Sequence, residues 1–406
     1  MKRVHALFAA RLAVLASFAA CSEPSSTAPA ADGGVPLLDA SSDAGASADA
    51  DAATSFDWDF PPDFPPPRVP ADNPMSAVKA QLGRRLFYDK RMSGNQTQSC
   101  ASCHDIAKSF TDGRATARGS TGQGHPRAAM NLANVGYMSA LGWANPLLLT
   151  LEQQALVPMF GDNPVELGLK DAEQLLARLR PDPVYVDLFA RAFPGVAAPI
   201  TLENVTKALA CFERTLLSGR SPYDRYLAGD ANALTASQKR GREMFFSERF
   251  ECYHCHAGFL FSDSTMTGLS KFYEVGFHNT ALYDLDGKGA YPEPNRGLME
   301  ITGKPADMGR FRVPSLRNVA VTAPYFHDGS AATLSDVLDH YAAGGRTITS
   351  GPYAGSDGSK SPLKSSLVRG FTLDSQEKVD LVAFLESLTD DGFLKDPRFG
   401  DPFTQP

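Results

Sequence analysis

Two short cysteine-histidine motifs are the residues of this sequence with the most evident chemistry. Cys100–His104 has the sequence CASCH, and Cys252–His256 has the sequence CYHCH. Two thiols separated by two residues can both form thioether bonds to one haem, and the histidine that follows then faces the iron. The pattern predicts two covalently bound haem c groups, one held by Cys100, Cys103 and His104 and the other by Cys252, Cys255 and His256.

Two other uses of the cysteines compete with this prediction. The two CxxC pairs could share one zinc ion, or each pair could form a disulfide. Structural zinc pairs usually lie closer in sequence, and zinc does not require a histidine directly after both pairs. Cys211 lies in an apolar stretch with helical spacing, so we expect an ordinary buried side chain. His254, between the cysteines of the second motif, is expected to face solvent.

The start of the chain predicts export and a tether. Residues 1–20 combine a basic start with a short apolar run, which is typical of a signal peptide. Cys21 follows two alanines and resembles a lipoprotein cleavage site, the alternative being plain signal cleavage. Residues 21–69 are rich in Ala, Ser, Asp and Pro and contain many acids, which predicts a disordered acidic tether from a membrane surface to a periplasmic protein.

Composition describes the rest of the chain as an ordinary globular protein. The 406 residues are 43% hydrophobic and 21% charged, with a formal net charge of −7. This is enough apolar side chain for a sizeable core, and it excludes a polytopic membrane protein. No basic field attracts nucleic acid. The only membrane contact expected is the lipid anchor at Cys21.

Several further segments follow the first haem motif in a fixed order. They are Phe110–Arg114 (FTDGR), Leu151–Pro158 (LEQQALVP), Asn163–Glu166 (NPVE), Phe311–Val319 (FRVPSLRNV) and Ala323–Gly329 (APYFHDG). Together with both haem motifs they resemble the bacterial di-haem cytochrome c peroxidase/MauG family, over about residues 74–388. Trp143–Pro146 (WANP) and Pro158–Gly161 (PMFG) are most similar to a MauG-like (MbnH-like) branch, whose members are paired with a partner protein.

The resemblance implies a mostly α-helical fold of two cytochrome c-like domains, each with one haem, and an active site where they meet. We place the domains at residues 70–230 and 231–406. Apolar spacing independently predicts helices over 171–192, 201–218, 235–246, 333–342 and 374–388. Thr201 and Asp374 are the expected N-caps, and Asp374 forms a capping box with Glu377. No repeated strand alternation is present.

For the first haem, the resemblance implies a peroxide site above the proximal ligand His104. The family's acid/base is the glutamate of the NPxE segment, here Glu166, and a glutamine upstream helps to place peroxide and water. That glutamine matches Gln154, with Gln153 left open by the spacing. Where many relatives carry a distal histidine ligand this chain has Ser120, and the nearest histidine is His125. We therefore expect an open first haem that needs no reductive activation.

For the second haem, the resemblance implies His256 as proximal ligand and a second ligand at Tyr341. Electron-transferring peroxidases have methionine there, MauG-like enzymes have tyrosine, and no methionine follows Met308 in this chain. His340 is the competing neighbour. Trp143 matches a tryptophan that carries electrons between the haems. Trp58 lies at the tether boundary, outside the range for this role.

Three further roles also follow from the resemblance. Calcium bound between the domains would use the backbone carbonyls of Thr322 and Pro324. The family's asparagine ligand is Ala128 here, with Asn131 nearby. Arg312 is expected near the second haem. His278 and His327 are expected to be hydrogen-bonded structural groups.

Taken together, the resemblance implies an enzyme that reacts with hydrogen peroxide, forms a bis-Fe(IV) state and oxidises an aromatic residue of an exported partner protein. The alternative is a cytochrome c peroxidase supplied with electrons by a small periplasmic protein. A third hypothesis is a tethered electron carrier with two saturated haems, which would have no use for Glu166 or Gln154. Tyr341 and the missing distal histidine favour the first.

Overall fold

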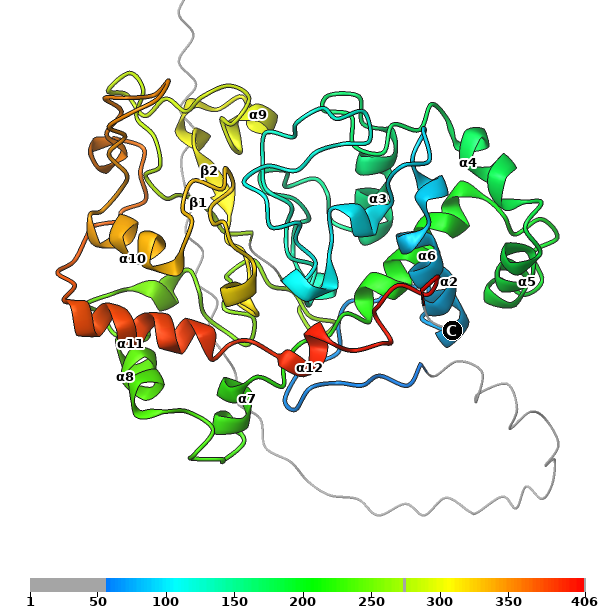
Figure 1. Cartoon of the computed structure of the whole chain (residues 1–406), viewed down its shortest axis with the longest axis horizontal. Coiled ribbons are helices and arrows are strands. Elements are labelled where there is room, and N and C mark those ends of the chain that lie inside the picture. The colour runs from blue at the N-terminus through cyan, green and yellow to red at the C-terminus, as the bar shows by residue number, and fades with distance from the viewer. Residues whose placement is uncertain (1–55, 273–274, 405–406) are drawn as a thin grey trace, which may run out of the picture. The chain divides into compact units, whose positions relative to one another are not determined.

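The structure is a computed structural model, and it describes residues 56–272 and 275–404 (Figure 1). The expected signal peptide, Cys21 and residues 22–55 of the expected tether lie outside this part. Within it the fold is mostly helical, with a single two-stranded sheet. None of the described helices is both long enough and apolar enough to cross a membrane.

The helices of the first half surround one apolar cluster that includes Leu82, Leu86, Leu175, Phe189 and Leu209. They are α2 (Ala77–Tyr88), α3 (Leu151–Phe160), α4 (Ala172–Leu179), α5 (Pro183–Ala192) and α6 (Leu202–Arg214). The helices of the second half lie on the other side of Figure 1. They are α7 (Pro222–Leu227), α8 (Ala236–Phe245), α9 (Met299–Thr302), α10 (Leu334–Ala342) and α11 (Ser375–Glu386), and α12 (Asp391–Leu394) follows. A second cluster, with Phe245, Phe261, Leu381 and Phe384, forms the core of this half, and α7, α8, α10 and α11 contribute to it.

Both halves use the same close helix crossing. A Cβ atom built on Gly83 of α2 would lie 1.9 Å from the carbonyl oxygen of Ala208 in α6. A Cβ atom built on Gly241 of α8 would lie 1.9 Å from the carbonyl oxygen of Asp380 in α11. Real side chains do not approach a backbone this closely, so only glycine permits either crossing. Each crossing joins the helix that precedes a haem motif to a later helix of the same half.

The predicted helices are largely confirmed, with different ends. Thr201 accepts a hydrogen bond from the amide of Asn204, and Asp374 forms the expected capping box with Glu377. The stretch 171–192 is two helices rather than one, because Asp182 caps a new helix with a proline at its first turn. Helix α6 ends at Arg214, earlier than the predicted end at 218. Helices α2, α3, α7, α9 and α12 were not predicted.

The packed part of the chain begins before the predicted tether end at residue 69. Phe64 packs edge-on against Phe259 and Tyr137, with ring centroids 4.8 and 6.1 Å apart. Trp58 and Phe60 pack against a third apolar cluster, which contains Tyr137. The Tyr137 hydroxyl donates to the carbonyl of Pro65. The prediction of a disordered tether is therefore wrong for residues 56–69, where aromatic side chains supply apolar area that the preceding stretch lacks.

The structure also moves the other domain limits. Phe393, Leu394 and Phe399 belong to the apolar cluster of the first half, and the Tyr88 hydroxyl donates to the carbonyl of Phe399 at 2.7 Å. The end of the expected second domain, 231–406, thus returns to the first. Conversely, Tyr223 of α7 packs in the second cluster, although it was assigned to 70–230.

The short sheet of the second half contacts the first half near the haem motifs. Strand β1 (Phe277–Asn279) pairs antiparallel with β2 (Arg310–Arg312), so that His278 lies opposite Phe311. The backbone amide of Arg312 donates to the carbonyl of Trp143, at 2.8 Å. This contact anchors the loop of Trp143 to the second half.

Candidate active site

The first CxxCH motif opens onto a cavity of about 330 Å³, called here the first cavity. Cys100, Cys103 and His104 line it. His104 is held from behind, because its Nδ1 lies 2.7 Å from the carbonyl oxygen of Phe110. Burial lowers the pKa of His104, so the imidazole is neutral and offers Nε2 to the cavity.

Glu166 lies in the first cavity on a tightly held turn. A Cβ atom on Gly119 would lie 1.8 Å from the carbonyl oxygen of Val165, so the segment around Gly119 packs directly on the backbone beside Glu166. The amide of Ser120 donates to the carbonyl of Glu166 at 2.7 Å. These contacts fix the backbone and leave the carboxyl group facing the cavity. Burial raises the pKa of Glu166 above its usual range.

The structure separates the alternatives around Glu166. Gln154 lines the first cavity, whereas Gln153 of the same helix is exposed. Ser120 is not among the lining residues, and its hydroxyl donates to the carbonyl of Leu167. His125 does line the cavity, and its Nε2 lies 3.9 Å from Oε1 of Glu166. The histidine nearest in sequence to the family's distal position is thus a neighbour of the candidate acid/base.

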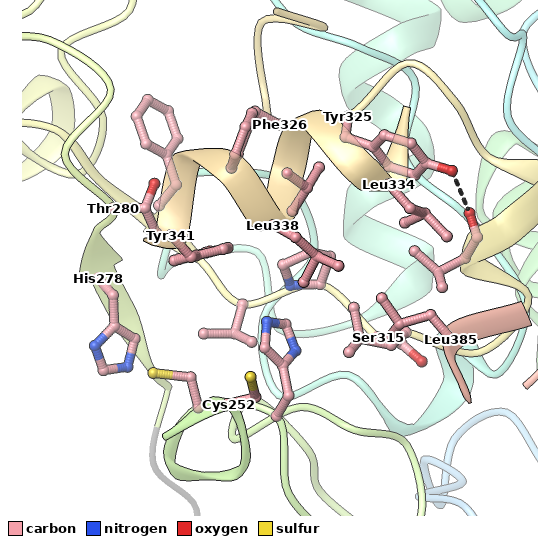
Figure 2. Close-up of a pocket in the computed structure, with 18 of the residues that line it drawn as sticks. Cys252, His278, Thr280, Ser315, Tyr325, Phe326, Leu334, Leu338, Tyr341 and Leu385 are labelled. Atoms are coloured by element: carbon pink, nitrogen blue, oxygen red, sulfur yellow. Dashed lines mark hydrogen bonds between the residues drawn. The ribbon is translucent and has the colours of Figure 1, made fainter. Parts of the chain in front are cut away.

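The second CxxCH motif opens onto a second cavity, of about 410 Å³. Cys252, Cys255 and His256 line it, and Nδ1 of His256 lies 2.9 Å from the carbonyl oxygen of Phe261. Figure 2 shows Cys252 on one side and helix α10 on the other, with Leu338 and Tyr341 directed into the space between. The wall is mostly apolar, as a buried macrocycle requires.

Tyr341 rather than His340 faces the second cavity. The His340 ring is turned away, since its Nε2 lies 2.7 Å from the carbonyl oxygen of Thr280. Burial raises the pKa of the Tyr341 phenol, so it stays protonated until a cation is close to its oxygen. The backbone therefore presents a tyrosine, and no methionine, at this position of the cavity.

Trp143 and Arg312 line both cavities. The indole Nε1 of Trp143 donates to the carbonyl of Ala128 at 2.8 Å, which fixes the ring. Arg312 was expected beside the second haem motif, and the structure extends its position to both cavities. Its guanidinium donates to the carbonyl of Gly142 at 3.1 Å and to the sulfur of Met138 at 2.8 Å.

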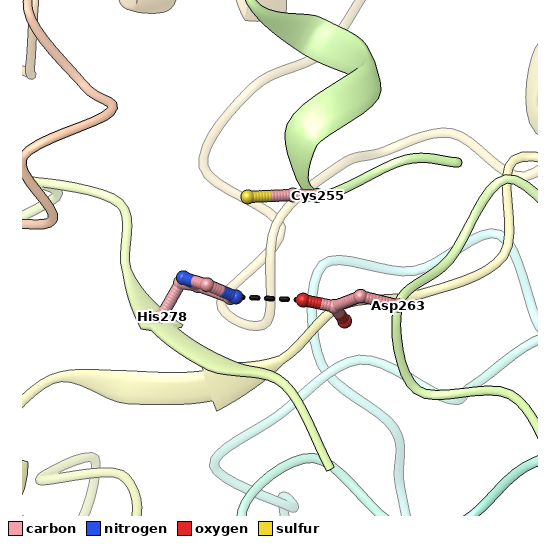
Figure 3. A group of neighbouring side chains, drawn as sticks. All are labelled: Cys255, Asp263 and His278. Atoms are coloured by element: carbon pink, nitrogen blue, oxygen red, sulfur yellow. Dashed lines mark hydrogen bonds and ion pairs between the residues drawn. The ribbon is translucent and has the colours of Figure 1, made fainter. Parts of the chain in front are cut away.

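The remaining histidines differ in whether their ring nitrogens have hydrogen-bond partners. His278 Nε2 lies 2.7 Å from Asp263, close to Cys255 (Figure 3), which confirms a hydrogen-bonded structural group. His327 was expected to be similar, but its Nε2 is buried without a partner among the described residues. Its ring stacks on Phe311 instead, with centroids 3.7 Å apart. His254 is exposed, as expected.

The cysteines fit haem attachment better than the competing uses. All five cysteines of the described residues are free thiols, and the two CxxC pairs line different cavities, so neither disulfides nor one shared zinc ion is formed. Cys211 is buried, as predicted.

The buried Arg312 gives an independent test of the fit to haem. No carboxylate of the described residues forms an ion pair with it. Burial lowers its pKa to about 10, so the guanidinium is still charged at neutral pH. A cation buried without a counter-ion is costly, and haem propionates are anions that would pair with it. Both cavities thus fit a haem group held by its own CxxCH motif.

The expected calcium site has weaker support. Thr322 and Pro324 line the second cavity. Asn131 Oδ1, however, already accepts hydrogen bonds from the Ala133 amide at 2.7 Å and the Ser109 hydroxyl at 3.0 Å. Ala128 has no side-chain oxygen. The side-chain ligand of the calcium prediction is therefore not free.

Sequence reasoning missed several residues in and near these cavities. Glu213 of α6 lines the first cavity, and burial raises its pKa to about 8. Arg127 and Glu300 form an ion pair of 2.7 Å beside the same cavity. None of these three residues belongs to a motif, and only the folded chain brings Arg127 and Glu300 together.

A mostly helical fold with two CxxCH-lined cavities and an aromatic ring between them defines a di-haem c-type protein. Comparisons with known proteins agree. A family model described as di-haem cytochrome c peroxidase matches residues 77–232. The chain is 37% identical over 352 residues to the cytochrome-c peroxidase IdrP1 of Pseudomonas sp. (strain SCT), an alignment that covers 83% of this chain and 86% of that protein.

Two MauG-type proteins are also similar. The methylamine utilization protein MauG of Methylorubrum extorquens is 34% identical over 319 residues, with 79% of this chain and 80% of that protein covered. The crystal structure of a MauG-like protein associated with microbial copper homeostasis is 52% identical, with a TM-score of 0.84, and the match covers 86% of this chain and 100% of that chain. The chain belongs to the di-haem cytochrome c peroxidase family, and it is an enzyme of the peroxidase/oxidase class.

Proposed function

We propose that this protein is a MauG-like oxidase, which uses hydrogen peroxide to oxidise an aromatic side chain of an exported partner protein. The observation that carries the proposal is Tyr341, which faces the second cavity where an electron-transferring peroxidase would present methionine. Thioether ligands raise a haem potential, whereas phenolate stabilises oxidised iron. A second haem of this kind is a poor acceptor of electrons from ordinary cytochromes.

The cofactors proposed are two haem c groups, in cytochrome c-like halves that meet near Trp143. When bound, the haems supply iron that reacts with peroxide and holds two oxidising equivalents. Cys100, Cys103 and His104 would hold the first haem. Cys252, Cys255, His256 and Tyr341 would hold the second.

The residues of the first cavity handle the protons of peroxide. Cleavage of the O–O bond requires one group to take a proton from one oxygen and return it to the other. Glu166 is suited to both steps, because its raised pKa brings proton release closer to neutral pH. Gln154 orients peroxide and water through its amide. Trp143, which lines both cavities, carries electrons between them.

The partner and the compartment are also part of the proposal. We place the enzyme in the periplasm, exported by residues 1–20 and anchored through a lipid on Cys21. A relative that is 52% identical is associated with microbial copper homeostasis, so we expect the partner among exported proteins of that process.

One observation favours a second candidate function. The IdrP1 relative, 37% identical to this chain, is named a cytochrome-c peroxidase. In this alternative a small electron-transfer protein reduces the haems after each turnover, and no partner residue is modified.

The test is a titration of the fully ferric, haem-loaded protein with one equivalent of peroxide. Optical and near-infrared spectra are followed with and without reduced cytochrome c. A long-lived oxidised spectrum that forms without prior reduction, and that cytochrome c hardly affects, is the result expected. Reaction only after one haem is reduced, followed by rapid oxidation of cytochrome c, would establish the peroxidase alternative.

A further inference from the structure

A row of aromatic rings leads away from Trp143 into the second half. The ring centroids of Trp143 and His327 are 6.5 Å apart, and those of His327 and Tyr291 are also 6.5 Å apart. Phe311 stacks on His327 at 3.7 Å. The rings of this group thus continue from the residue that lines both cavities to a buried tyrosine.

Two more tyrosines extend the row to the surface. Tyr291 lies 5.2 Å from Tyr283, and Tyr283 lies 5.5 Å from Tyr353, between ring centroids. Tyr283 and Tyr291 are buried, whereas Tyr353 is 36% exposed. Tyrosine and tryptophan are the side chains that lose an electron most readily, so the row places oxidisable groups at short intervals.

Tyr283 also has a proton acceptor. Its hydroxyl donates to Oδ2 of Asp328 at 2.7 Å, and Arg346 pairs with the same carboxylate at 3.3 Å. A phenol that loses an electron becomes a strong acid, so a carboxylate in hydrogen-bond contact can take its proton. The Tyr291 hydroxyl donates to the amide oxygen of Asn279, at 2.8 Å, which is a far weaker base. An oxidising equivalent that leaves the haems is therefore held at Tyr283 rather than at Tyr291.

The pKa of Tyr283 indicates that its phenol is still protonated when it is oxidised. Burial, together with the charge of Asp328, raises it to about 12, so the phenol keeps its proton until an electron leaves.

The exposed end of the row lies in an uncharged loop. Residues 349–355, with the sequence TSGPYAG, are all exposed and contain no ionisable group apart from Tyr353 itself. A protein surface can approach such a loop without desolvating charges.

We propose that Trp143, Tyr291, Tyr283 and Tyr353 form the electron path by which this enzyme oxidises its partner, and that the partner presents an exposed tryptophan or tyrosine to the loop around Tyr353. The inference rests on the proposed function and specifies where the partner binds.

The electrons and protons of the path balance. The oxidant is hydrogen peroxide, which takes up two electrons from the partner and two protons from solvent to give two waters, while the oxidised partner residue releases two protons to solvent. Each passage is the transfer of one electron along the path. Tyr283 gives an electron towards Trp143 and its phenolic proton to Asp328. This leaves a neutral tyrosyl radical and a neutral carboxylic acid. The partner's aromatic residue then returns an electron through Tyr353, and Asp328 returns the proton to Tyr283. Two passages remove two electrons from the partner.

The chain contains a matched control for Tyr283. Tyr185 is buried, its hydroxyl donates to Oδ2 of Asp89 at 2.6 Å, and the guanidinium of Arg91 lies 5.0 Å from its ring centroid. The environment matches that of Tyr283, but the ring neighbour of Tyr185 among the described residues is Phe189. A radical that follows the path forms at Tyr283 and not at Tyr185.

The first measurement is EPR on the ferric holoprotein, frozen after one equivalent of peroxide with no partner present. We expect a minor tyrosyl radical signal, in exchange with the oxidised haems, in the wild type and in Tyr185→Phe, and its loss in Tyr283→Phe. Asp328→Asn, which keeps the shape but removes the base, should also lose it. The optical change of the haems on peroxide addition is recorded in every sample.

The second measurement tests whether the electron path ends at Tyr353. The spin trap 2-methyl-2-nitrosopropane is present during the peroxide reaction, and the adduct is mapped by mass spectrometry. An adduct at Tyr353 that Tyr283→Phe abolishes supports the path. A normal optical change without a radical at Tyr283, or without an adduct at Tyr353, overturns the path and leaves the proposed function standing. No optical change in the ferric wild type overturns both.

Discussion

The His125 ring lies between the backbone of Arg127 and the carboxyl group of Glu166. Its Nδ1 lies 3.0 Å from the amide nitrogen and 3.1 Å from the carbonyl oxygen of Arg127, and its Nε2 lies 3.9 Å from Oε1 of Glu166. Burial lowers the pKa of His125, so the neutral ring persists at physiological pH. The carboxyl group of Glu166 thus faces a neutral polar ring and not a full charge.

Glu166→Gln should abolish rapid reaction with peroxide, because glutamine keeps the shape but cannot accept a proton. We expect the rate of the optical change to fall by about 10²–10⁴, the usual contribution of a positioned acid/base. Stopped-flow mixing of the ferric holoprotein with peroxide measures this rate. Glu203→Gln, on the exposed face of α6, is the control and should react as the wild type does. A normal rate in Glu166→Gln would remove Glu166 from the mechanism.

The pH dependence of the same reaction should report on Glu166 and His125. Burial raises the pKa of Glu166, so the ionised form that accepts a proton is lost as pH falls, beginning at a higher pH than for an exposed carboxyl group. His125→Phe replaces a polar ring beside Glu166 with an apolar one, which disfavours the carboxylate, so the midpoint of the pH profile should move to higher pH, by less than about one unit. An unchanged midpoint would show that His125 does not act on Glu166.

Tyr341→Phe tests the second haem ligand without disturbing helix α10. Phenylalanine fills the same space but has no oxygen to offer, so we expect the ferric second haem to lose its low-spin EPR signal. Tyr325→Phe is the matched control, because Tyr325 also lines the second cavity while its hydroxyl donates to the carbonyl of Val319 at 3.1 Å (Figure 2). If both variants kept the wild-type signal, Tyr341 would be no ligand.

The parts of the site that sequence could predict are those whose chemistry is local. The haem cysteines and histidines lie within five consecutive residues, so their spacing alone indicates their use. Glu166 and Tyr341 belong to no such motif and were found only through resemblance to a family. Tyr283 and Asp328 are distant in sequence, and only the fold brings them into hydrogen-bond contact.

The errors in the predicted domain limits have a related cause. Overall composition described residues 21–69 as one tether, although Phe56, Trp58, Phe60 and Phe64 concentrate aromatic area at its end. Those aromatics were the signal for a packed segment. The return of Phe399 to the first half had no comparable signal in the sequence.

The two glycine crossings should be sensitive positions for stability. Gly83→Ala and Gly241→Ala each place a methyl group 1.9 Å from a carbonyl oxygen of the facing helix, so the helices must separate. We expect a loss of about 3 kcal/mol in the free energy of unfolding for each, the upper end for overpacking. Chemical denaturation of the holoprotein measures it. Gly392→Ala in α12, where the nearest atom lies 3.4 Å away, should change stability little or increase it slightly.

Glu213 should make the protein less stable as pH rises. Burial raises its pKa in the folded state to about 8, from 4.5 for the free side chain. A group whose folded-state pKa is raised contributes stability that is fully present below the unfolded pKa and is lost as pH rises through the folded one. The loss amounts to at most about 5 kcal/mol at 1.36 kcal/mol per unit. Glu213→Gln has no proton to lose, so it should not show this decline.

The comparison is made by chemical denaturation of both holoproteins at about pH 5 and about pH 8.5, on either side of the raised pKa. At the lower pH the two should differ little in stability, because both side chains are neutral in the folded protein and this pH is only about half a unit above the unfolded-state pKa. At the higher pH the variant should be the more stable. Equal stability at both pH values would mean that the Glu213 carboxylate is solvated or paired in the folded protein, and that the first cavity admits water or a cation beside α6.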